Sequence, residues 1–517
     1  MTTAPLFVGI DIGTTGSRCM AFDAAGGCVA SAYEEYPLQH IRSGWVEQSL
    51  PQLLEATMRV CHAVAADPRI DTGAVVSIGL SNQMCATCAT TATGELLRPM
   101  ISWQDTRTAA QLEQITQHMA EERIRAITGM PLLPLAVLPK ILWLREHEPS
   151  VYERAEKWLQ IQDIALKQLG AEDFFLDVSQ MYAYSMWNVP ETKWSDELLA
   201  LAGLTPSHFG NVVPAGTQVG VLSAGAATRT GFRAGTPLCV GAGDQQCGLI
   251  GMGATKPDVA AITLGTAAML TVTLPRPRTD LTEFMLLNHP VADQWALQGL
   301  VIGGASTYRW FRDVFGQSEV EAERRDGRSA FDRLNELAAQ APLGAAGLLF
   351  LPYLASAGAP HWNPDARGSF LGIAQHHGRA HFARAVMEGV ALEMSDSLLR
   401  MDAYGLDTQC IRLGGGATRS SLWNQIQADV YGRPVQLLEE AESTALGAAL
   451  LGGVGAGFFS SIDEGVAAMV RVARTIEPDP QRQARYAELR DVYCDAYGSL
   501  AATVFGKLAR LQTAADP

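Results

Sequence analysis

The stretch that decides the fold is Leu6-Phe7-Val8-Gly9-Ile10-Asp11-Ile12-Gly13-Thr14-Thr15-Gly16-Ser17-Arg18, close to the N-terminus. Its apolar run predicts a β-strand, and the Gly/Thr run that follows predicts a tight turn. Residues 19–22 predict a return strand, so the whole stretch is expected to form a β-hairpin. A turn rich in glycine and hydroxyl groups exposes backbone N–H groups and threonine Oγ atoms, which can bind an anion.

The same arrangement recurs beyond the middle of the chain. Residues 260–264 predict a strand, Gly265 and Thr266 a turn, and residues 268–272 a return strand. Two such hairpins, one in each half, predict a duplicated fold with a phosphate between the halves. Two ordinary hairpins with tight turns are the alternative. Strand and helix patterns alternate elsewhere, which is typical of the α/β class.

Composition limits the class of protein before any motif is considered. The chain has 517 residues, with 39 Lys+Arg, 54 Asp+Glu and a net charge of −15. Hydrophobic residues make up 48% and charged residues 18%, which excludes an intrinsically disordered chain. The length predicts two large domains. The acidic excess argues against nucleic acid as a partner, because Lys and Arg must neutralise a phosphate backbone.

The sequence also carries expectations about location. We find no basic segment followed by a long apolar segment at the N-terminus, and no run of about 20 apolar residues, so we expect no signal peptide and no membrane partner. The small residues at 444–457 instead predict a tightly packed helix. Nine scattered cysteines suit a cytoplasmic protein. Cys85 and Cys88 form a CxxC without a second ligand pair, which favours two packed residues over a zinc site.

The common nucleotide-binding motifs are missing. There is no GxxxxGK[ST] loop, and no GxGxxG stands between a strand and a helix. Residues 241–246, Gly-Ala-Gly-Asp-Gln-Gln, follow the apolar run 238–240. They are therefore expected at a strand end, where α/β enzymes place their ligand-binding groups.

Several longer segments carry a family resemblance. Gly368-Ser369-Phe370-Leu371-Gly372-Ile373 is followed after seven residues by His381-Phe382-Ala383-Arg384-Ala385-Val386-Met387-Glu388. With residues 44–48, 103–107, 360–368 and 414–418, this segment resembles the FGGY family of carbohydrate kinases over nearly the whole chain. The resemblance implies the two-domain actin-like ATPase (ribonuclease H-like) fold, with the active-site cleft between the domains. The N-terminal domain is expected at residues 1–252 and the C-terminal domain at 253–517.

The resemblance implies a reaction, the transfer of the γ-phosphoryl group of ATP to a hydroxyl group of a small sugar or polyol. Asp244 would be the general base that takes the proton of the attacking hydroxyl group, whereas a plain strand-end Asp would cap the next helix. Asp11 would hold Mg²⁺ through water, because Mg²⁺ keeps much of its hydration shell. A turn-stabilising Asp is the alternative for Asp11.

The resemblance also implies a nucleotide site made by turns from both halves. Small residues at 415–417 would let adenine lie close to the backbone. A solvated residue is the alternative for Arg18, and close packing is the alternative for Gly304. The implied nucleotide-binding residues are Thr14, Thr15, Arg18, Gly265, Thr266, Gly304, Gly415, Gly416, Ala417 and Ser420.

The acceptor site is expected around Asp244. Cys85 stands where similar members usually have His, and Leu135 and Val137 stand where aromatic, small or hydroxylated residues are usual. Trp103 would offer its ring face to a sugar, with a core Trp as an equal interpretation, and Asp105 is about as well explained by an ion pair with Arg107. The expected acceptor-binding residues are Met84, Cys85, Trp103, Asp105, Asp244 and Gln245.

Residues 304–313 and 349–354 are similar to segments of the xylulose-phosphorylating members of the family. This resemblance implies a specific expectation, the conversion of D-xylulose to D-xylulose 5-phosphate. Other acceptors remain open: glycerol or another polyol, gluconate, ribulose, or autoinducer-2. A different class, an actin-like or chaperone-like ATPase without a sugar substrate, is the second alternative. The expected partners are therefore ATP and a small sugar or polyol, and a homodimer is the expected assembly.

Overall fold

The computed structural model describes residues 4–515, so the predicted domain ends at 1 and 517 lie outside the described residues. The chain forms two compact units, and each takes in separate segments of the sequence. The first is built from the chain up to Thr255, Leu274–Ala296 and Glu442–Arg471, and the second from Lys256–Thr273, Leu297–Ala441 and the chain from Val472. The units therefore exchange segments, whereas the sequence-based division at residue 252 is continuous.

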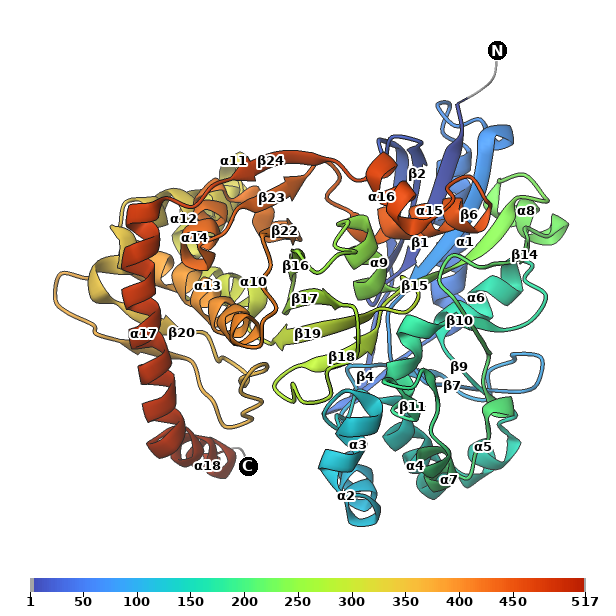
Figure 1. The fold of residues 1–517 in the computed structure, drawn as a ribbon, viewed down its shortest axis with the longest axis horizontal. Coiled ribbons are helices and arrows are strands. Elements are labelled where there is room, and N and C mark those ends of the chain that lie inside the picture. The colour runs from blue at the N-terminus through green and yellow to red at the C-terminus, as the bar shows by residue number, and fades with distance from the viewer. Residues whose placement is uncertain (1–3, 516–517) are drawn as a thin grey trace. The chain divides into compact units, whose positions relative to one another are not determined.

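A six-stranded mixed sheet forms the centre of the first unit (Figure 1). Its neighbours β15, β6 and β1 run parallel, and β2 returns antiparallel to β1. In spatial order the strands are β14 (Gln218–Val221), β15 (Pro237–Gly243), β6 (Val75–Asn82), β1 (Leu6–Ile12), β2 (Gly16–Asp23) and β3 (Cys28–Glu35). Ile12 pairs with Ser17 at the tip of the β1–β2 hairpin, which confirms the first predicted hairpin.

Helices cover both faces of this sheet. Val8 shares a buried apolar cluster with Leu53 of α1 (Leu50–Ala65), whereas Phe7 shares one with Ala445 of α15 (Ser443–Gly455). Successive side chains of a strand point to opposite faces, so α1 and α15 lie on opposite sides of β1. A Cβ atom on Gly9 would lie 1.9 Å from the carbonyl oxygen of Ala445, so α15 lies flush on the strand. The predicted tight helix packing is confirmed.

The remaining elements of the first unit surround this core. Helices α2, α3, α4, α5 and α7, with small sheets above them, form the lower part of the unit in Figure 1. The remaining strands of the first unit are β4 (Gln39–Arg42), β5 (Trp45–Gln48), β7 (Cys88–Thr90), β8 (Met100–Ile101), β9 (Lys157–Leu159), β10 (Phe175–Asp177), β11 (Trp187–Asn188), β12 (Lys193–Trp194), β13 (Asn211–Val213) and, after β15, β18 (Met285–Asn288). Its helices are α2 (Ala109–His118), α3 (Glu121–Thr128), α4 (Val137–His147), α5 (Pro149–Arg154), α6 (Ile161–Leu169), α7 (Asp196–Ala202), α8 (Ala224–Thr230), α9 (Asp244–Gly251) and α16 (Ile462–Met469), with 3₁₀ turns at Thr72–Ala74, Val178–Tyr184 and Pro206–His208.

The second unit has a mixed sheet of its own. Strands β16 and β17 form an antiparallel hairpin in which Leu264 pairs with Ala268, which confirms the second predicted hairpin. The sheet has seven strands in the order β18, β19 (Trp295–Val301), β17 (Ala268–Leu274), β16 (Val259–Leu264), β22 (Cys410–Gly414), β23 (Val435–Leu438) and β24 (Val472–Ile476). A separate ribbon joins β20 (Leu349–Leu351) and β21 (Ser369–Leu371).

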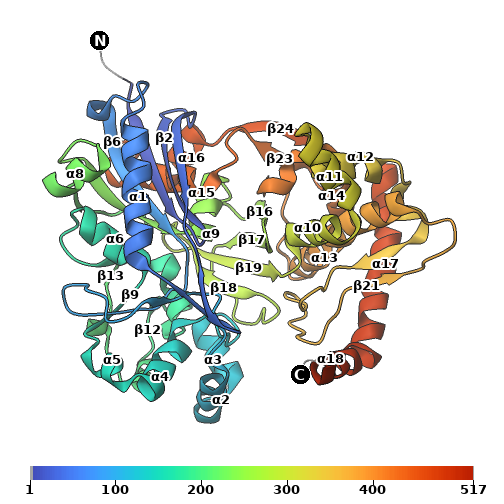
Figure 2. The ribbon, with the colours of Figure 1, turned by 180° about the vertical axis from the view of Figure 1, so that it is seen from behind.

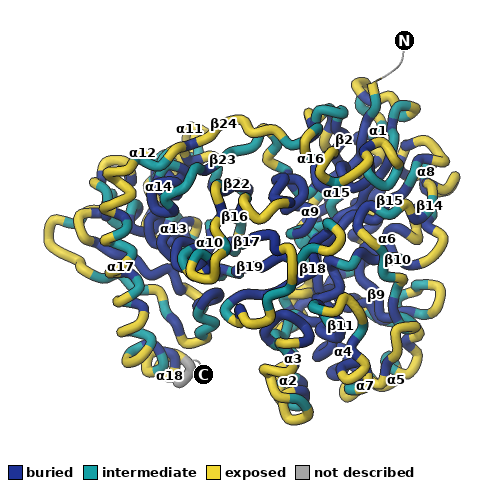
Figure 3. Tube along the Cα trace, in the orientation of Figure 1, coloured by how far each residue is buried: buried dark blue, intermediate teal, exposed yellow. Residues whose placement is uncertain are grey.

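Helix α13 (Arg379–Ala403) is the central helix of the second unit. It is largely buried, as the dark blue tube in Figure 3 shows, and it packs against α10, α12 and α14 (Figure 2). The other helices are α10 (Gly304–Phe315), α11 (Gln317–Asp326), α12 (Ala330–Ala339), α14 (Ser421–Tyr431), α17 (Pro480–Thr503) and α18 (Phe505–Ala515), with 3₁₀ turns at Leu343–Gly347 and Gly416–Arg419. Within residues 4–515, no helix combines the length and apolar character needed to cross a bilayer.

Candidate active site

Two carboxylates lie at the carboxyl ends of parallel strands in the first unit. Asp11 is the penultimate residue of β1 and pairs in register with Ser81 of β6. Asp244 directly follows β15, whose last residue, Gly243, pairs with Asn82. Because β6 lies between β1 and β15, the sheet brings both aspartates to the same edge (Figure 1). This edge is where α/β folds bind ligands.

Both carboxyl groups are surrounded by protein, although each residue keeps some exposed surface. Burial and then the charge of Asp244 raise the pKa of Asp11 to about 7, and burial raises the pKa of Asp244 to about 6. Among the described residues, Oδ1 of Asp11 has no hydrogen-bond partner. An orphaned carboxylate oxygen beside a second carboxylate is a suitable Mg²⁺ ligand, because the cation offsets both charges.

The metal fit is limited to this pair. Residues 4–515 contain no group of three or more His, Cys, Asp or Glu placed to hold an ion. Mg²⁺ does not need such a group, because it commonly binds one or two carboxylates and takes its other ligands from water and phosphate oxygens. Asp11 with its free oxygen fits that mode of binding.

Hydrogen bonds from other parts of the first unit to its carbonyl groups hold the turn between β1 and β2 in place. The carbonyl oxygen of Gly13 accepts hydrogen bonds from the hydroxyl group of Tyr36 (2.6 Å) and from Nε2 of Gln83 (3.2 Å). That of Thr14 accepts one from Nε2 of Gln48 (2.8 Å), and that of Thr15 accepts one from the N–H of Tyr36 (3.0 Å).

This arrangement orients the opposite side of the turn. In a trans peptide the C=O of one residue and the N–H of the next point in opposite directions. Protein donors hold the carbonyls of Gly13 and Thr14, so the N–H groups of Thr14 and Thr15 point away from those donors. Thr15 is exposed and Thr14 partly so. The turn therefore has the polarity of an anion-binding nest, as predicted from its Gly/Thr composition.

Arg18 lies opposite Asp11 across the hairpin, which places both side chains on one face of the sheet. Its guanidinium group pairs with Glu442 at 3.3 Å and lies over the ring of Tyr33. A quarter of the side chain, 27%, remains exposed. Arg18 is thus a partnered residue next to the carboxylate pair, rather than a fully solvated one.

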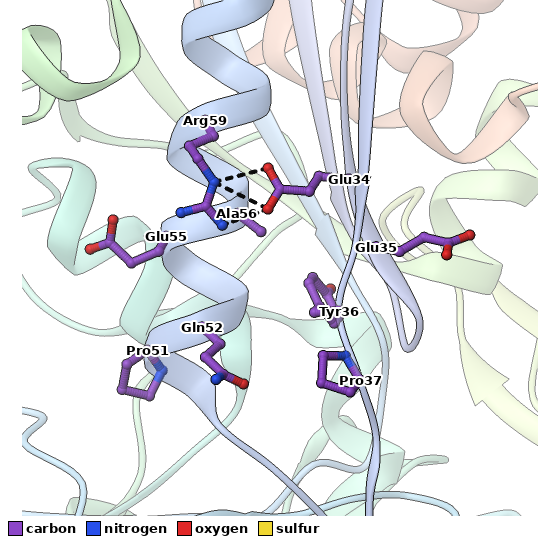
Figure 4. A pocket seen from close by; sticks show the side chains of 9 residues that line it. All are labelled: Glu34, Glu35, Tyr36, Pro37, Pro51, Gln52, Glu55, Ala56 and Arg59. Carbon is purple, nitrogen blue, oxygen red and sulfur yellow. Dashed lines mark hydrogen bonds and ion pairs between the residues drawn. The ribbon is translucent and has the colours of Figure 1, made fainter.

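A surface groove lies behind this turn, between the end of β3 and α1 (Figure 4). It has a volume of about 400 Å³, and the Glu34–Arg59 ion pair lies across it. Tyr36 lines the groove and also bonds Gly13, so one side chain joins the groove wall to the turn. The residues of the groove wall are Glu34, Glu35, Tyr36, Pro37, Pro51, Gln52, Glu55, Ala56 and Arg59.

Three expected acceptor-binding residues lie near Asp244. A Cβ atom on Gly243 would lie 2.4 Å from Sδ of Met84, so Met84 packs against the residue that precedes Asp244. Cys85 is buried with a positive φ of 61°, and burial raises the pKa of its thiol to about 12. Cys85 is therefore a neutral thiol at physiological pH. Gln245 is the second residue of α9, and its N–H donates to Oδ1 of Asp244 at 2.8 Å.

Asp105 and Trp103 differ in burial and in their hydrogen-bond partners. Asp105 is fully buried, and its two oxygens accept hydrogen bonds from Arg107 and from the N–H of Val46. The structure thus shows the structural ion pair that was the alternative for Asp105, and its acceptor contact stays a prediction. Trp103 is 38% exposed, and its Nε1 donates to Oγ1 of Thr14 at 2.9 Å.

The second unit brings four of its predicted nucleotide residues together. The N–H of Ala305, in the first turn of α10, donates to the carbonyl oxygen of Gly265 at 2.8 Å. A Cβ atom on Gly304 would lie 2.5 Å from the carbonyl carbon of Ala267, and one on Gly415 would lie 2.4 Å from the carbonyl oxygen of Leu264. The close packing proposed as the alternative for Gly304 is therefore present. Thr266 is exposed at the tip of the turn.

The last three nucleotide candidates follow β22. Gly416 is exposed, and a Cβ atom added to it would meet no described atom within 4 Å, whereas Ala417 is buried. Oγ of Ser420 accepts a hydrogen bond from the N–H of Trp423 at 3.2 Å, which makes Ser420 the N-cap of α14. A ribose or base contact by Ser420 stays a prediction.

Sequence reasoning missed the residues that hold these turns in place. Tyr36, Gln48 and Gln83 bind the carbonyls of the first turn, and they lie far from it in sequence. Gln48 does stand at the end of the family segment 44–48, which was the available signal. Lys140 stands in a second family segment, residues 139–144, but was given no role, and Tyr182 was missed. Burial and then the charges of Cys85 and Asp244 raise the pKa of Tyr182.

The two α/β units, each with a strand–Gly/Thr–strand turn, agree with the two-domain actin-like ATPase fold. The chain belongs to the FGGY family of carbohydrate kinases, whose N-terminal domain model matches residues 6–251 and whose C-terminal domain model matches residues 260–456. The predicted fold class and family are confirmed.

Similarity to individual kinases supports this assignment to the family. The chain is 32% identical over 465 residues to a gluconokinase of Bacillus subtilis, with 88% of each chain covered. It is 30% identical over 502 residues to a xylulose kinase of Escherichia coli, with 96% of this chain and 99% of that one covered. A ligand-bound xylulose kinase structure from Lactobacillus acidophilus matches with a TM-score of 0.87 at 25% identity, over 98% of this chain and 100% of that one.

Proposed function

We propose that the protein transfers the γ-phosphoryl group of MgATP to a hydroxyl group of a neutral sugar, with D-xylulose as the first candidate and D-xylulose 5-phosphate as the product. The observation that carries the proposal is the position of Asp244 at the carboxyl end of β15, beside Asp11. Because the reaction consumes ATP, the proposal places the protein in the cytoplasm.

Asp244 acts as the general base in this proposal. With a pKa of about 6 it is mostly ionised at neutral pH and remains basic enough to accept a proton. The acceptor hydroxyl group attacks the γ-phosphorus in line, its proton passes to the Asp244 carboxylate, and the bond from phosphorus to the β,γ-bridging oxygen breaks. ADP leaves with that oxygen.

The binding of MgATP, the phosphoryl donor, is assigned to residues of both Gly/Thr turns. Mg²⁺ supplies positive charge to the phosphate oxygens, and Asp11 would hold it with its unpartnered Oδ1. The N–H groups of Thr14 and Thr15 bind phosphate oxygens, and Arg18 adds a positive charge on the same face. In the second unit, Gly265 and Thr266 form the second phosphate turn, with Gly304 beneath it. Gly415, Gly416, Ala417 and Ser420 are assigned to the adenosine moiety.

A neutral acceptor suits the side chains around Asp244. Met84 is apolar, and the thiol of Cys85 is neutral, so neither offers a charge to a sugar acid. The similarity to a xylulose kinase supports D-xylulose. Gluconate is the second candidate, because the chain is equally similar to a gluconokinase.

The test is an acceptor panel read by coupled ADP release. D-xylulose, D-ribulose, glycerol, gluconate and autoinducer-2 are compared with a reaction lacking acceptor. We expect D-xylulose to give the highest kcat/KM, and Asp244→Asn to lower turnover by about 10²- to 10⁴-fold while ATP still binds. Asp196→Asn, at the exposed start of α7, is the matched control. ADP release that is independent of every acceptor would favour a plain ATPase and overturn the proposal.

A further inference from the structure

Lys140 is a fully buried lysine in the first turn of α4. Its Nζ donates three hydrogen bonds, to the carbonyl oxygens of Cys85 (2.9 Å), Ser102 (2.9 Å) and Leu135 (2.8 Å). An ammonium group has three donors, so all of them are used, and each goes to a backbone carbonyl group. Burying a cation among neutral dipoles is costly compared with an apolar side chain of similar size. Fold stability alone therefore does not explain a lysine here.

The three carbonyl groups belong to three separate loops. Cys85 lies in the loop after β6, Ser102 lies in the loop after β8, and Leu135 precedes α4. Two of the loops carry expected acceptor-binding residues, Cys85 itself and Trp103 next to Ser102. The third carries Leu135, one of the two positions that depart from the residues usual in the family. One ammonium group thus links all three loops, whereas the backbone bridge between Thr87 and Ile101 joins only the first two.

The backbone conformation of Cys85 gives a second reason for the hydrogen bond from Lys140. Its φ of 61° lies in the left-handed region, which a non-glycine residue adopts only at a cost of about 1 kcal/mol or more. The hydrogen bond from Lys140 to the Cys85 carbonyl stabilises this conformation. Met84, which packs against Gly243, precedes Cys85 directly. The position of Met84 beside Asp244 therefore depends on the same loop.

We propose that Lys140 is a positioning residue of the acceptor site, whose ammonium group holds the three acceptor loops in their binding arrangement through their carbonyl oxygens. This inference rests on the proposed function, because it takes the surroundings of Asp244 as the acceptor site. It assigns no contact between Lys140 and the sugar.

We call the three hydrogen bonds from Nζ of Lys140 the tripod. The tripod depends on the charge of the lysine. Burial lowers the pKa of Lys140 to about 8, opposed by Cys85 and Asp105 and assisted by Arg107. A neutral amine keeps only two N–H donors, so one of the three carbonyls loses its partner above that pH. The acceptor KM of the unmodified protein should therefore rise between about pH 7 and 9.5, whereas the KM for ATP should not follow.

Lys140→Met tests the inference, because methionine has a similar length and no donor. Lys157→Met is the matched control, since Nζ of Lys157 also bridges two backbone carbonyls, those of Ser207 (2.8 Å) and Phe209 (3.0 Å). At about pH 7.5 we expect Lys140→Met to raise the KM of the best panel acceptor at least tenfold and to change the KM for ATP by less than threefold. Lys157→Met should change both by less than threefold. The rise of acceptor KM with pH should disappear in Lys140→Met and persist in Lys157→Met.

Equal increases of both KM values, or a pH-dependent rise that survives in Lys140→Met, would overturn the inference. If Lys140→Met does not fold, the pH series on the unmodified protein decides: a flat acceptor KM overturns the inference. If no panel acceptor is turned over, the proposed function fails by itself. Backbone hydrogen exchange then tests Lys140, and faster exchange in Lys140→Met confined to residues 84–87, 102–105 and 133–137 supports the tripod, whereas unchanged or general exchange overturns it.

Discussion

Nε1 of Trp103 donates a hydrogen bond to Oγ1 of Thr14 at 2.9 Å. A residue predicted to bind the sugar thus contacts a residue predicted to bind a phosphate group of ATP. An indole N–H only donates, and the threonine oxygen must therefore act as the acceptor. The hydroxyl hydrogen of Thr14 is left to donate elsewhere, which is the role that a phosphate oxygen requires. The relationship joins the two halves of the proposed chemistry within the first unit.

Trp103→Phe should weaken ATP use while it keeps an aromatic ring for the sugar. Removal of the N–H frees the Thr14 hydroxyl group to rotate, so we expect the KM for ATP to rise about three- to tenfold, the effect of one hydrogen bond of about 1 kcal/mol. The coupled ADP assay measures this change. Trp295→Phe, which removes a 3.1 Å bond to the carbonyl of Val189, is the control. An ATP KM that matches the control would contradict the role of this contact.

Tyr36→Phe should loosen the first phosphate turn from behind. The variant deletes the 2.6 Å bond to the Gly13 carbonyl without touching the nucleotide, so we expect a higher KM for ATP, about fivefold, and an unchanged acceptor KM. Tyr152→Phe deletes an equally short bond, 2.6 Å to the carbonyl of Ala202, in another part of the same unit. The idea fails if both variants lose stability alike and neither alters ATP binding.

Activity should fall on the acid side as Asp244 gains a proton. The pKa of Asp244 is raised to about 6, and only its ionised form can accept the hydroxyl proton. We therefore expect kcat/KM for the acceptor to fall tenfold per pH unit well below 6 and to level off near pH 7, above which the rise in acceptor KM expected from Lys140 lowers it again. Initial rates from pH 5 to 8 at saturating ATP measure the profile. A rate that is constant down to pH 5 would argue against Asp244 as the base.

Local sequence pattern was enough to predict both hairpins, because each depends on an apolar run, a Gly/Thr turn and a return run within about 20 residues. The composition of the units was harder to predict. Helix α15 belongs to the first unit because its small residues let it lie flush on β1. Small residues at 444–457 predicted tight packing, but no local pattern names the sheet that receives the helix.

The positions of candidate site residues could be predicted where they depend only on the strand that carries the residue. Asp11 and Asp244 stand at strand ends, and the sheet order brings them to one edge. Asp105 was named, but the partners of its two oxygens depend on how its loop folds onto Arg107 and Val46. The role of Lys140 could not be predicted, since it depends on three loops that meet only in the folded chain.

Glu393→Gln should stabilise the protein, and more so at high pH. Glu393 is buried in α13, and its Oε2 has no hydrogen-bond partner among residues 4–515. Burial and then the charge of Asp396 raise its pKa from 4.5 to about 8. The folded state therefore holds a proton that the unfolded state releases above pH 4.5, and stability falls as pH rises from 4.5 to 8. A neutral amide removes this loss.

The expected gain in the free energy of unfolding is about 1 to 3 kcal/mol at pH 8 and much smaller at pH 5. Urea unfolding of both proteins at the two pH values measures the difference. Glu336→Gln, which removes an exposed carboxylate paired with Arg328, is the control and should change stability little at either pH. A Glu393→Gln effect of the same size at pH 5 and pH 8 would show that packing, rather than the buried charge, determines stability at this position.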